Sequence, residues 1–151
     1  MRTSGEQQRG EALRDQQPAT GELTRSERCG PLRVLFIEDS EDVLRLMKLE
    51  MERLGYAVLA ANDAESGLDL ARRELPDVVV SDIQLPGLDG YELIRRIRRV
   101  PELSCIPAIA LTGFCLEKHV EMALSAGFTA HLSKPIEPEA LNSLIRRLTS
   151  L

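Results

Sequence analysis

The sequence predicts an α/β protein with a doubly wound parallel sheet, built from five strand–helix units in the pattern (βα)5. From residue 32 onward, apolar runs of strand length alternate five times with segments of helical periodicity. Two of the runs, VLFI and VVVS, are apolar at consecutive residues, which is typical of central parallel strands covered on both faces. Helix start and stop signals stand at several of the junctions between these segments.

The elements can be placed in order along the chain. The expected strands are Leu32–Ile37, Tyr56–Ala61, Asp77–Ser81, Ala108–Leu111 and Thr129–Leu132. The expected helices, one after each strand, are Glu41–Leu54, Ala64–Arg73, Tyr91–Arg99, Leu116–Ala126 and Pro138–Leu148. Two residue pairs have the spacing of a capping box, Asn62 with Glu65 and Asp89 with Glu92. Pro138 suits a first helical position, and Gly55 and Gly127 stand just past helix ends.

Polar residues stand where the predicted strands end. Glu38 and Asp39 follow LRVLFI, Asp82 follows VVVS, Thr112 follows IPAIAL, and Lys134 follows TAHLS. Right-handed crossovers leave few strand orders. We expect the flavodoxin-like order 2-1-3-4-5, with strands 1 and 3 side by side at the switch point where ligands bind. The carboxyl ends of parallel strands share one edge of the sheet, so these five residues should meet there.

This combination of residues suits a divalent metal and a phosphoryl group. Three carboxylates repel one another unless a cation joins them, and hard oxygen ligands without His or Cys select Mg²⁺ or a similar ion such as Mn²⁺. A carboxylate can also form an aspartyl-phosphate, for which Lys134 and the metal would supply positive charge. Singly, each residue has an ordinary explanation: Asp39, for example, could cap the first helix. The joint pattern favours the functional interpretation.

Composition bounds the remaining possibilities. The 151 residues include 43% hydrophobic and 28% charged residues, with a net charge of −5, and no basic stripe indicates nucleic-acid binding. No apolar run approaches the length of a membrane span or of a signal peptide. Cys29, Cys105 and Cys115 form no C-x-x-C pair, so we expect free thiols and a cytoplasmic protein. Residues 1–31 are polar and are expected to form a disordered arm before a domain at residues 32–151.

From Leu32 to Leu151 the chain resembles the receiver domain of two-component response regulators. The matching stretches are VLFIEDSEDV, SDIQLPGLDGYELIRRIR, PAIALTG and AGFTAHLSKPI. The resemblance implies that Asp82 accepts a phosphoryl group from a phosphohistidine on a histidine kinase or a histidine phosphotransfer protein. It is closer to receivers attached to hybrid sensor kinases, or to stand-alone regulators, than to transcriptional ones.

The resemblance also implies a role for each residue around the acceptor. Glu38 and Asp39 would hold Mg²⁺ together with Asp82 and the backbone carbonyl of Gln84. Thr112 and Lys134 would contact the phosphoryl oxygens, and the Lys134–Pro135 bond would be cis.

Three further positions follow from the resemblance. The switch residue, which is commonly Tyr or Phe in the family, is His131 here. Gln84 and Phe114 stand two residues after Asp82 and Thr112, at positions that gate the water that hydrolyses the phosphoaspartate. Phe114 is bulky and would slow hydrolysis, so Phe114→Ala should shorten the phosphorylated lifetime. The alternatives are that His131 is an ordinary sheet-edge residue and that Phe114 packs on a helix.

The first predicted helix suggests where a phosphodonor docks. Its core side is formed by Val43, Leu44, Met47, Met51 and Leu54. Leu49 falls nearly opposite and Leu46 lies on the flank, so both are available to a partner, although a single exposed Leu needs no explanation. The downstream target would bind the face formed by helix 4, strand 5 and helix 5, which includes His131 and Arg146.

Two other functions are possible. A pseudo-receiver would be a phosphorylation-independent interaction module, and such modules typically lack one of the acidic or lysine residues that are all present here. A haloacid-dehalogenase-like phosphatase would need a second Asp two places after the nucleophile, where this chain has Gln84. We therefore expect a signalling phosphoacceptor rather than an enzyme. Only Thr149 to Leu151 follow the last predicted helix, so no output domain is expected.

Overall fold

The computed structural model describes residues 30–113 and 117–150. Its five parallel strands form one sheet in the order β2-β1-β3-β4-β5, as predicted. The strands are β1 (Arg33–Ile37), β2 (Ala57–Ala61), β3 (Val78–Asp82), β4 (Ala108–Thr112) and β5 (Ala130–Ser133). The helices are α2 (Glu41–Arg53), α3 (Ala64–Glu74), α4 (Gly90–Arg98), α5 (Glu117–Ala126) and α6 (Pro138–Thr149), with a short 3₁₀ helix η1 (Pro101–Leu103) that was not predicted. The predicted arm at residues 1–31 falls almost wholly outside the described residues and stays a prediction.

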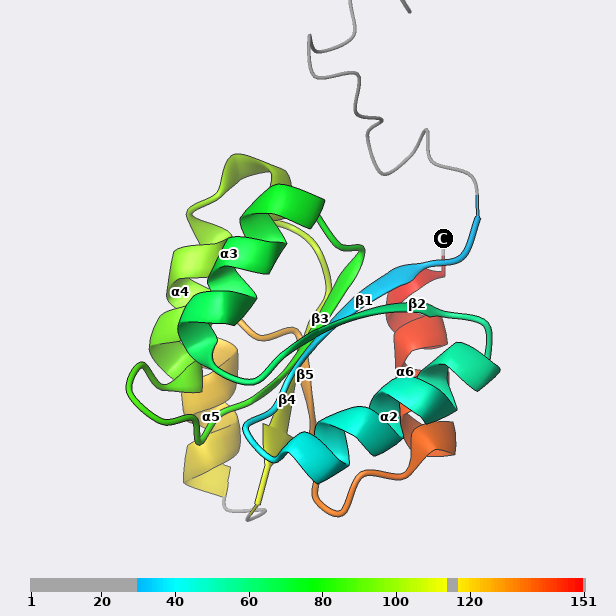
Figure 1. Ribbon diagram of the computed structural model, residues 1–151. Coiled ribbons are helices and arrows are strands. Elements are labelled where there is room, and N and C mark those ends of the chain that lie inside the picture. The colour runs from blue at the N-terminus through cyan, green and yellow to red at the C-terminus, as the bar shows by residue number, and fades with distance from the viewer. Residues whose placement is uncertain (1–29, 114–116, 151) are drawn as a thin grey trace, which may run out of the picture. The chain divides into compact units, whose positions relative to one another are not determined.

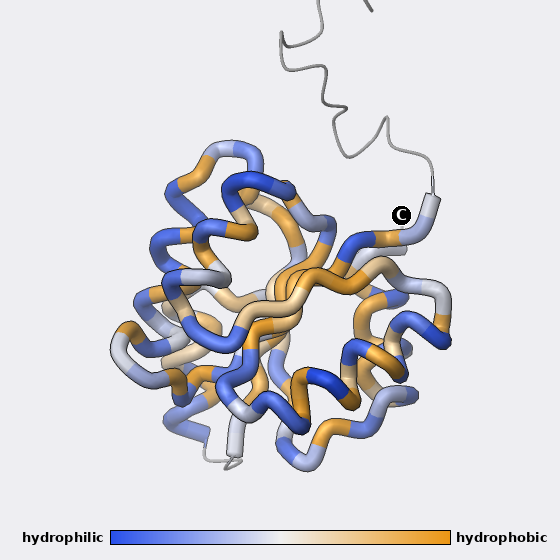
Figure 2. The backbone as a smooth tube through the Cα atoms, viewed as in Figure 1, coloured by the Kyte–Doolittle hydropathy of each residue, from blue (hydrophilic) through white to orange (hydrophobic). Residues whose placement is uncertain are grey.

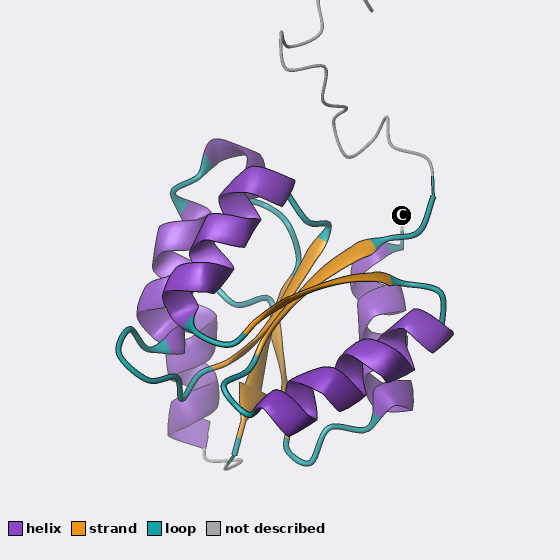
Figure 3. Cartoon of the chain, in the orientation of Figure 1, coloured by secondary structure: helices purple, strands orange, loops and turns teal. Residues whose placement is uncertain are grey.

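Helices cover both faces of the sheet. In Figure 1, α3, α4 and α5 lie on one side of the strands, and α2 and α6 lie on the other. Figure 3 shows the same arrangement by secondary structure. Side chains alternate across a strand, so Val34 and Phe36 enter the core under α2 and α6 while Leu35 and Ile37 enter the opposite one. This explains the uninterrupted apolar run of β1, and Figure 2 shows the apolar strands at the centre.

The predicted helix starts are right at one capping pair and wrong at the other. Asp89 caps α4, and its side chain accepts a hydrogen bond from the Glu92 N–H at 2.9 Å. At α3 the cap is Asp63 rather than Asn62, and it accepts from the Ser66 N–H at 2.7 Å. Both Asn and Asp are good caps, so the adjacent pair left the position ambiguous, and the backbone register after β2 decides it. Gly55 and Gly127 have φ of 105° and 134°, as expected for residues just past helix ends.

The α2 helix buries a narrower face than its sequence indicates. Met47 and Met51 are buried as predicted, but Val43 and Leu54 are 36% and 38% exposed. Both lie near the ends of the helix, where neighbouring elements cover less of its surface. Leu46 and Leu49 are 55% and 54% exposed, as expected.

Element ends differ from the predictions by a residue or so, which is ordinary for helix and strand boundaries. Two of these differences concern the site. Strand β3 runs through Asp82 and β4 runs through Thr112, so both residues are the last of their strands rather than the first of a loop. The predicted start of the fourth helix, Leu116, lies outside the described residues. Within the described part of the chain, no helix is long and apolar enough to cross a membrane.

Candidate functional site

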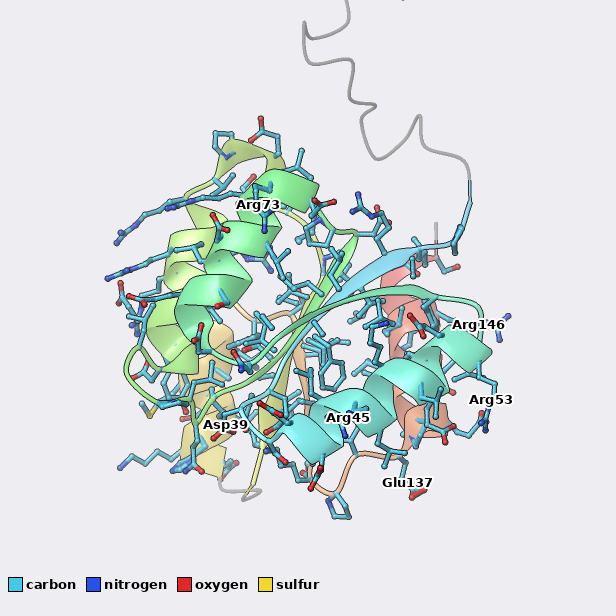
Figure 4. All side chains as sticks on the ribbon, in the orientation of Figure 1. Asp39, Arg45, Arg53, Arg73, Glu137 and Arg146 are labelled. Carbon is cyan, nitrogen blue, oxygen red and sulfur yellow. The ribbon has the colours of Figure 1, made fainter. Side chains whose placement is uncertain are left out.

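The sheet brings the predicted acidic residues together at its carboxyl edge. Carboxylate oxygens of Glu38, Asp39 and Asp82 lie within 4.8 Å of one another. Glu38 and Asp82 are only 1% and 4% exposed, whereas Asp39 is exposed at the rim. Figure 4 labels Asp39 at this edge, beside the start of α2. Strands β1 and β3 are neighbours in the sheet, and this pairing places the three carboxylates in one cluster.

Asp82 is held through both of its carboxylate oxygens. Its Oδ1 accepts a hydrogen bond from the backbone N–H of Gln84 at 3.0 Å. Its Oδ2 accepts from the Nζ of Lys134 at 2.7 Å. The backbone carbonyl of Asp82 accepts from the Ser81 hydroxyl at 2.9 Å, which fixes the end of the strand from inside. The carboxylate is therefore oriented before any ligand arrives.

Lys134 joins the end of β5 to the acidic cluster. Its backbone N–H donates to the Thr112 carbonyl at 2.8 Å, which carries the β4–β5 pairing past the last strand residue. Its Nζ lies 2.7 Å from Asp82 Oδ2 and 3.2 Å from Glu38 Oε1. Burial lowers the pKa of Lys134, but the hydrogen bond and charge of Asp82 and the charge of Glu38 outweigh it, so the pKa is raised. The ammonium form is therefore secured at neutral pH.

Glu38 is a buried carboxylate that lies close to two others. Burial, with the charge of Asp82, raises the pKa of Glu38 above its usual range, against the lowering effects of the Ser40 N–H and of Lys134. The Ser40 N–H donates to Oε2 at 3.1 Å. The other oxygen, Oε1, is buried and has no hydrogen-bond partner among the described residues, although it lies near the Lys134 ammonium. Lys134 pairs with two of the three clustered carboxylates, those of Glu38 and Asp82, and the three carboxylates together fit a hard divalent cation.

The sequence left open that Asp39 merely caps the first helix, and Ser40 excludes this explanation. The N-cap of α2 is Ser40, whose hydroxyl accepts from the Val43 N–H at 3.4 Å. Asp39 is therefore not the helix cap and stands at the rim beside the other carboxylates. Sequence reasoning did not single out Ser40, although a Ser directly before an acidic first turn is a recognisable helix start.

Thr112 ends β4 directly beside this cluster. It is buried, and its hydroxyl donates to the Leu132 carbonyl at a long 3.5 Å. A long bond of this kind is weak, so the hydroxyl can leave it for a stronger acceptor at little cost. In the β4–β5 register Thr112 faces Ser133, one residue before Lys134.

Of the three predicted switch and gating residues, His131 and Gln84 lie in the described part of the chain and Phe114 does not. His131 lies on the edge strand β5, half-buried, and its Nδ1 is buried without a hydrogen-bond partner in the described part of the chain. Gln84 is exposed, and its backbone N–H holds Asp82. Phe114 lies outside the described residues, so its gating role stays a prediction. The Lys134–Pro135 bond is cis, as predicted.

Two surface grooves lie outside the acidic cluster. One, of about 450 Å³, is lined by α2 and the end of β2 and includes Leu44, Arg45 and Lys48. The other, of about 520 Å³, lies over β5 between α5 and α6 and includes His131 and Arg147. Neither of these two grooves is lined by Asp82 or Glu38.

Comparison with known proteins identifies the family. Residues 34–146 match the response regulator receiver domain family. The chain belongs to this family. An uncharacterised 14.6 kDa protein of Leptolyngbya boryana is 39% identical over 114 residues, which cover 76% of this chain and 87% of that protein. The transcriptional regulatory protein AfsQ1 of Streptomyces coelicolor is 37% identical over 113 residues. That match covers 75% of this chain and 49% of AfsQ1, so the receiver domain spans about half of the relative.

A solved receiver domain shows the same fold with a metal. The receiver domain of the sensor histidine kinase PA1611 from Pseudomonas aeruginosa matches with a TM-score of 0.73 and 30% identity. The match covers 79% of this chain and 98% of that one. In that structure a magnesium ion is coordinated in the active-site cleft. The flavodoxin-like receiver fold predicted from sequence is therefore confirmed.

Proposed function

We propose that this receiver domain is the phosphoacceptor of a two-component or phosphorelay system and that Asp82 takes the phosphoryl group from a phosphohistidine. The geometry of Asp82 carries the proposal. The residue ends a central strand, is almost fully buried, and is held by Lys134 on one oxygen and by Gln84 on the other. A carboxylate fixed in this way beside a cation and two further carboxylates is suited to attack a phosphorus atom.

The transfer step can be written from these residues. An oxygen of the Asp82 carboxylate forms the new O–P bond while the P–N bond to the partner's imidazole breaks. The electron pair of the broken bond goes to the imidazole nitrogen, which takes up a proton from water. Lys134 Nζ, 2.7 Å from Asp82 Oδ2, lies where it can neutralise charge on the phosphoryl oxygens. The Thr112 hydroxyl can exchange its weak bond to Leu132 for a phosphoryl oxygen.

Magnesium or manganese is the cofactor that fits this chemistry. Glu38, Asp39 and Asp82, with the backbone carbonyl of Gln84, would hold it. When bound, the ion neutralises charge on the transferring phosphoryl group. The magnesium ion in the similar receiver domain of PA1611 supports the choice of metal.

Two surfaces would link the site to partners. The phosphodonor, a histidine kinase or a histidine phosphotransfer protein, would dock beside α2, where Leu46 and Leu49 are exposed. The downstream protein target would bind over α5, β5 and α6, a face that includes the groove beside His131. Rotation of His131 behind Thr112 would connect the two. We place the protein in the cytoplasm, where kinases of this class present their phosphohistidine.

The rival functions fit the site less well. A phosphorylation-independent module has no need of three carboxylates gathered at one site, two of them buried, which is costly to keep. A haloacid-dehalogenase-like phosphatase needs an acid two residues after the nucleophile, and Gln84 stands there with its backbone N–H engaged on Asp82. We therefore assign the chain a signalling role and not an enzymatic one.

The decisive experiment is phosphorylation of the purified protein by a small acyl-phosphate donor with Mg²⁺, read by intact mass, with beryllofluoride binding followed by NMR. Wild type should gain one phosphoryl group, and Asp82→Asn should gain none. Asp89→Asn is the matched control, because Asn also caps a helix and Asp89 lies outside the cluster. If wild type takes neither probe, the pseudo-receiver interpretation stands. Turnover of a generic phosphate ester would instead favour the phosphatase.

A further inference from the structure

The first residue of α4, Gly90, lies against the backbone of the acceptor. Gly90 is buried, and its N–H donates to the Ile83 carbonyl at 2.9 Å. A Cβ added at this position would lie 2.5 Å from Ile83 Cα and 2.6 Å from the backbone oxygen of Asp82. Gly90 is not among the glycines with positive φ. The requirement for glycine is therefore one of space and not of backbone conformation.

This contact closes the loop that follows the acceptor. The Ile83 N–H donates to the Leu111 carbonyl at 3.3 Å, and the Gln84 N–H donates to Asp82 Oδ1 at 3.0 Å. The hydrogen bond from the Gly90 N–H to the Ile83 carbonyl then joins the start of α4 to the same segment. The backbone at residues 82–84 is thus held by β4 on one side and by the start of α4 on the other.

We propose that Gly90 is a positioning residue of the acceptor site. Because it has no side chain, α4 packs directly on the Asp82–Ile83 backbone and sets the positions of the Asp82 carboxylate and of the Gln84 backbone. The inference rests on the proposed function for its metal and phosphoryl consequences. The geometric part, the placement of Gln84 relative to Asp82, stands without it.

The size of the expected displacement follows from the contacts. Carbon atoms pack at about 3.5–4.0 Å, so an alanine Cβ that starts 2.5 Å from Ile83 Cα forces a movement of roughly 1 Å. The atoms that it meets are backbone, and no side-chain rotation can relieve the clash. Catalytic and binding groups must be held to within about 0.5 Å, and Mg²⁺ demands near-ideal octahedral geometry. The displacement is therefore large enough to disturb the site.

Gly67 of α3 offers a matched control within the same chain. It is also a buried helical glycine, and an added Cβ would lie 2.6 Å from Ile37 Cδ1 and 2.9 Å from Ile37 Cγ1. These atoms belong to the side chain of Ile37 and not to backbone, so a change of its rotamer can relieve the overlap. Gly67→Ala thus introduces a comparable overlap without moving the backbone of the acceptor loop.

The test measures site geometry and metal affinity separately in Gly90→Ala, Gly67→Ala and wild type. The first readout is amide hydrogen exchange of Gln84 by NMR without metal. The second is Mg²⁺ affinity by titration of the protein's NMR shifts with the metal alone. Both are run with trimethylamine oxide if needed, because this osmolyte favours the folded state. We expect Gly90→Ala to lose the protection of the Gln84 amide and to bind Mg²⁺ at least about 10-fold more weakly. Gly67→Ala should stay within about twofold of wild type in both.

The outcomes separate this inference from the proposed function. If wild type does not bind Mg²⁺, the proposed function fails, and the Gln84 exchange still decides the positioning role. If Gly90→Ala folds with a protected Gln84 amide and wild-type Mg²⁺ affinity, α4 has moved outward instead and the positioning role is wrong. A Gly90→Ala protein that stays unfolded even in the osmolyte also overturns it, because the glycine would then serve the fold and not the site.

Discussion

Replacement of Arg98 by Met tests how the helices on one face are tied to the amino edge of the sheet. Arg98 is the last residue of α4 and is half-buried. Its guanidinium donates four hydrogen bonds: to the carbonyls of Ile106 at 2.6 Å, Gly127 at 3.0 Å and Leu103 at 3.0 Å, and to the Thr129 hydroxyl at 3.3 Å. These partners belong to η1, the entry to β4, the end of α5 and the entry to β5. Met keeps the packing of the aliphatic stem and removes only the donors.

The magnitude follows from the groups left behind. Three backbone carbonyls lose a charged donor, and each buried acceptor left unsatisfied costs about 1–3 kcal/mol. Arg98 is partly exposed, so water replaces some of these bonds, and we expect a total loss of about 3 kcal/mol in the free energy of unfolding. With a urea m-value of about 1–3 kcal/mol/M, the midpoint should fall by at least roughly 1 M.

The assay is urea unfolding followed by circular dichroism, with Arg96→Met as the matched control. Arg96 is exposed on the same helix and pairs only at the surface with Glu92, Nε to Oε2 at 3.2 Å. Its replacement should cost less than about 0.5 kcal/mol. Mg²⁺ affinity should be unchanged in both variants, because Arg98 acts at the opposite edge of the sheet from Asp82. Equal stability of the two variants would refute the reasoning.

Three further predictions follow from the described contacts. The Ser66 N–H holds the pKa of Asp63 below its usual range in the folded protein. The stability that the Asp63 cap contributes is therefore complete above the ordinary carboxyl pKa, and it is lost as the pH falls through the lowered pKa of the folded state. Asp63→Asn should remove this loss of stability at acidic pH, whereas Asn62→Ala should leave the loss intact. The measurement is the unfolding midpoint across acidic pH. If the loss disappears in Asn62→Ala instead, Asn62 is the cap, as first predicted. Tyr56→Phe deletes the hydrogen bond from the Tyr56 hydroxyl to Asn142 Oδ1, 2.5 Å, and should cost about 1 kcal/mol in urea unfolding, and no loss would show that the bond is not formed in solution. Leu49→Glu should slow phosphotransfer from a phosphohistidine protein that phosphorylates wild type, without affecting labelling by a small donor. The control is Leu124→Glu in α5, which should leave the transfer unchanged. Normal transfer by Leu49→Glu would count against docking beside α2.

The strand order and the cluster of acidic residues were accessible from sequence because they depend on simple regularities. Parallel strands that are covered on both faces show as continuous apolar runs, and the chain turns at their carboxyl ends. The residue that follows each run is therefore placed at the same edge whatever the details of packing. Glu38, Asp82 and Thr112 could be assigned to one site for this reason, and the family resemblance then separated their roles.

Other features depend on distances across the folded chain. Arg98 looks like one of several basic residues on an exposed helix face. Its guanidinium has four acceptors only because η1, the end of α5 and the entries to β4 and β5 pack around it. Gly90 looks like a turn residue after Asp89, and only the packing of α4 on Ile83 shows that a side chain has no room there. The choice of Asp63 rather than Asn62 as the cap of α3 likewise depends on how the backbone leaves the end of β2.

The sequence by itself determined the fold, the edge of the sheet at which the chemistry lies and the residue types gathered there, because hydrophobic periodicity and strand polarity are local properties. The tertiary structure decided how that edge is held. It set Lys134 between Asp82 and Glu38, buried the Glu38 carboxylate beside Asp82, and packed Gly90 on the acceptor backbone. These are contacts between residues far apart in the chain, and their distances are fixed only when helices and strands pack together.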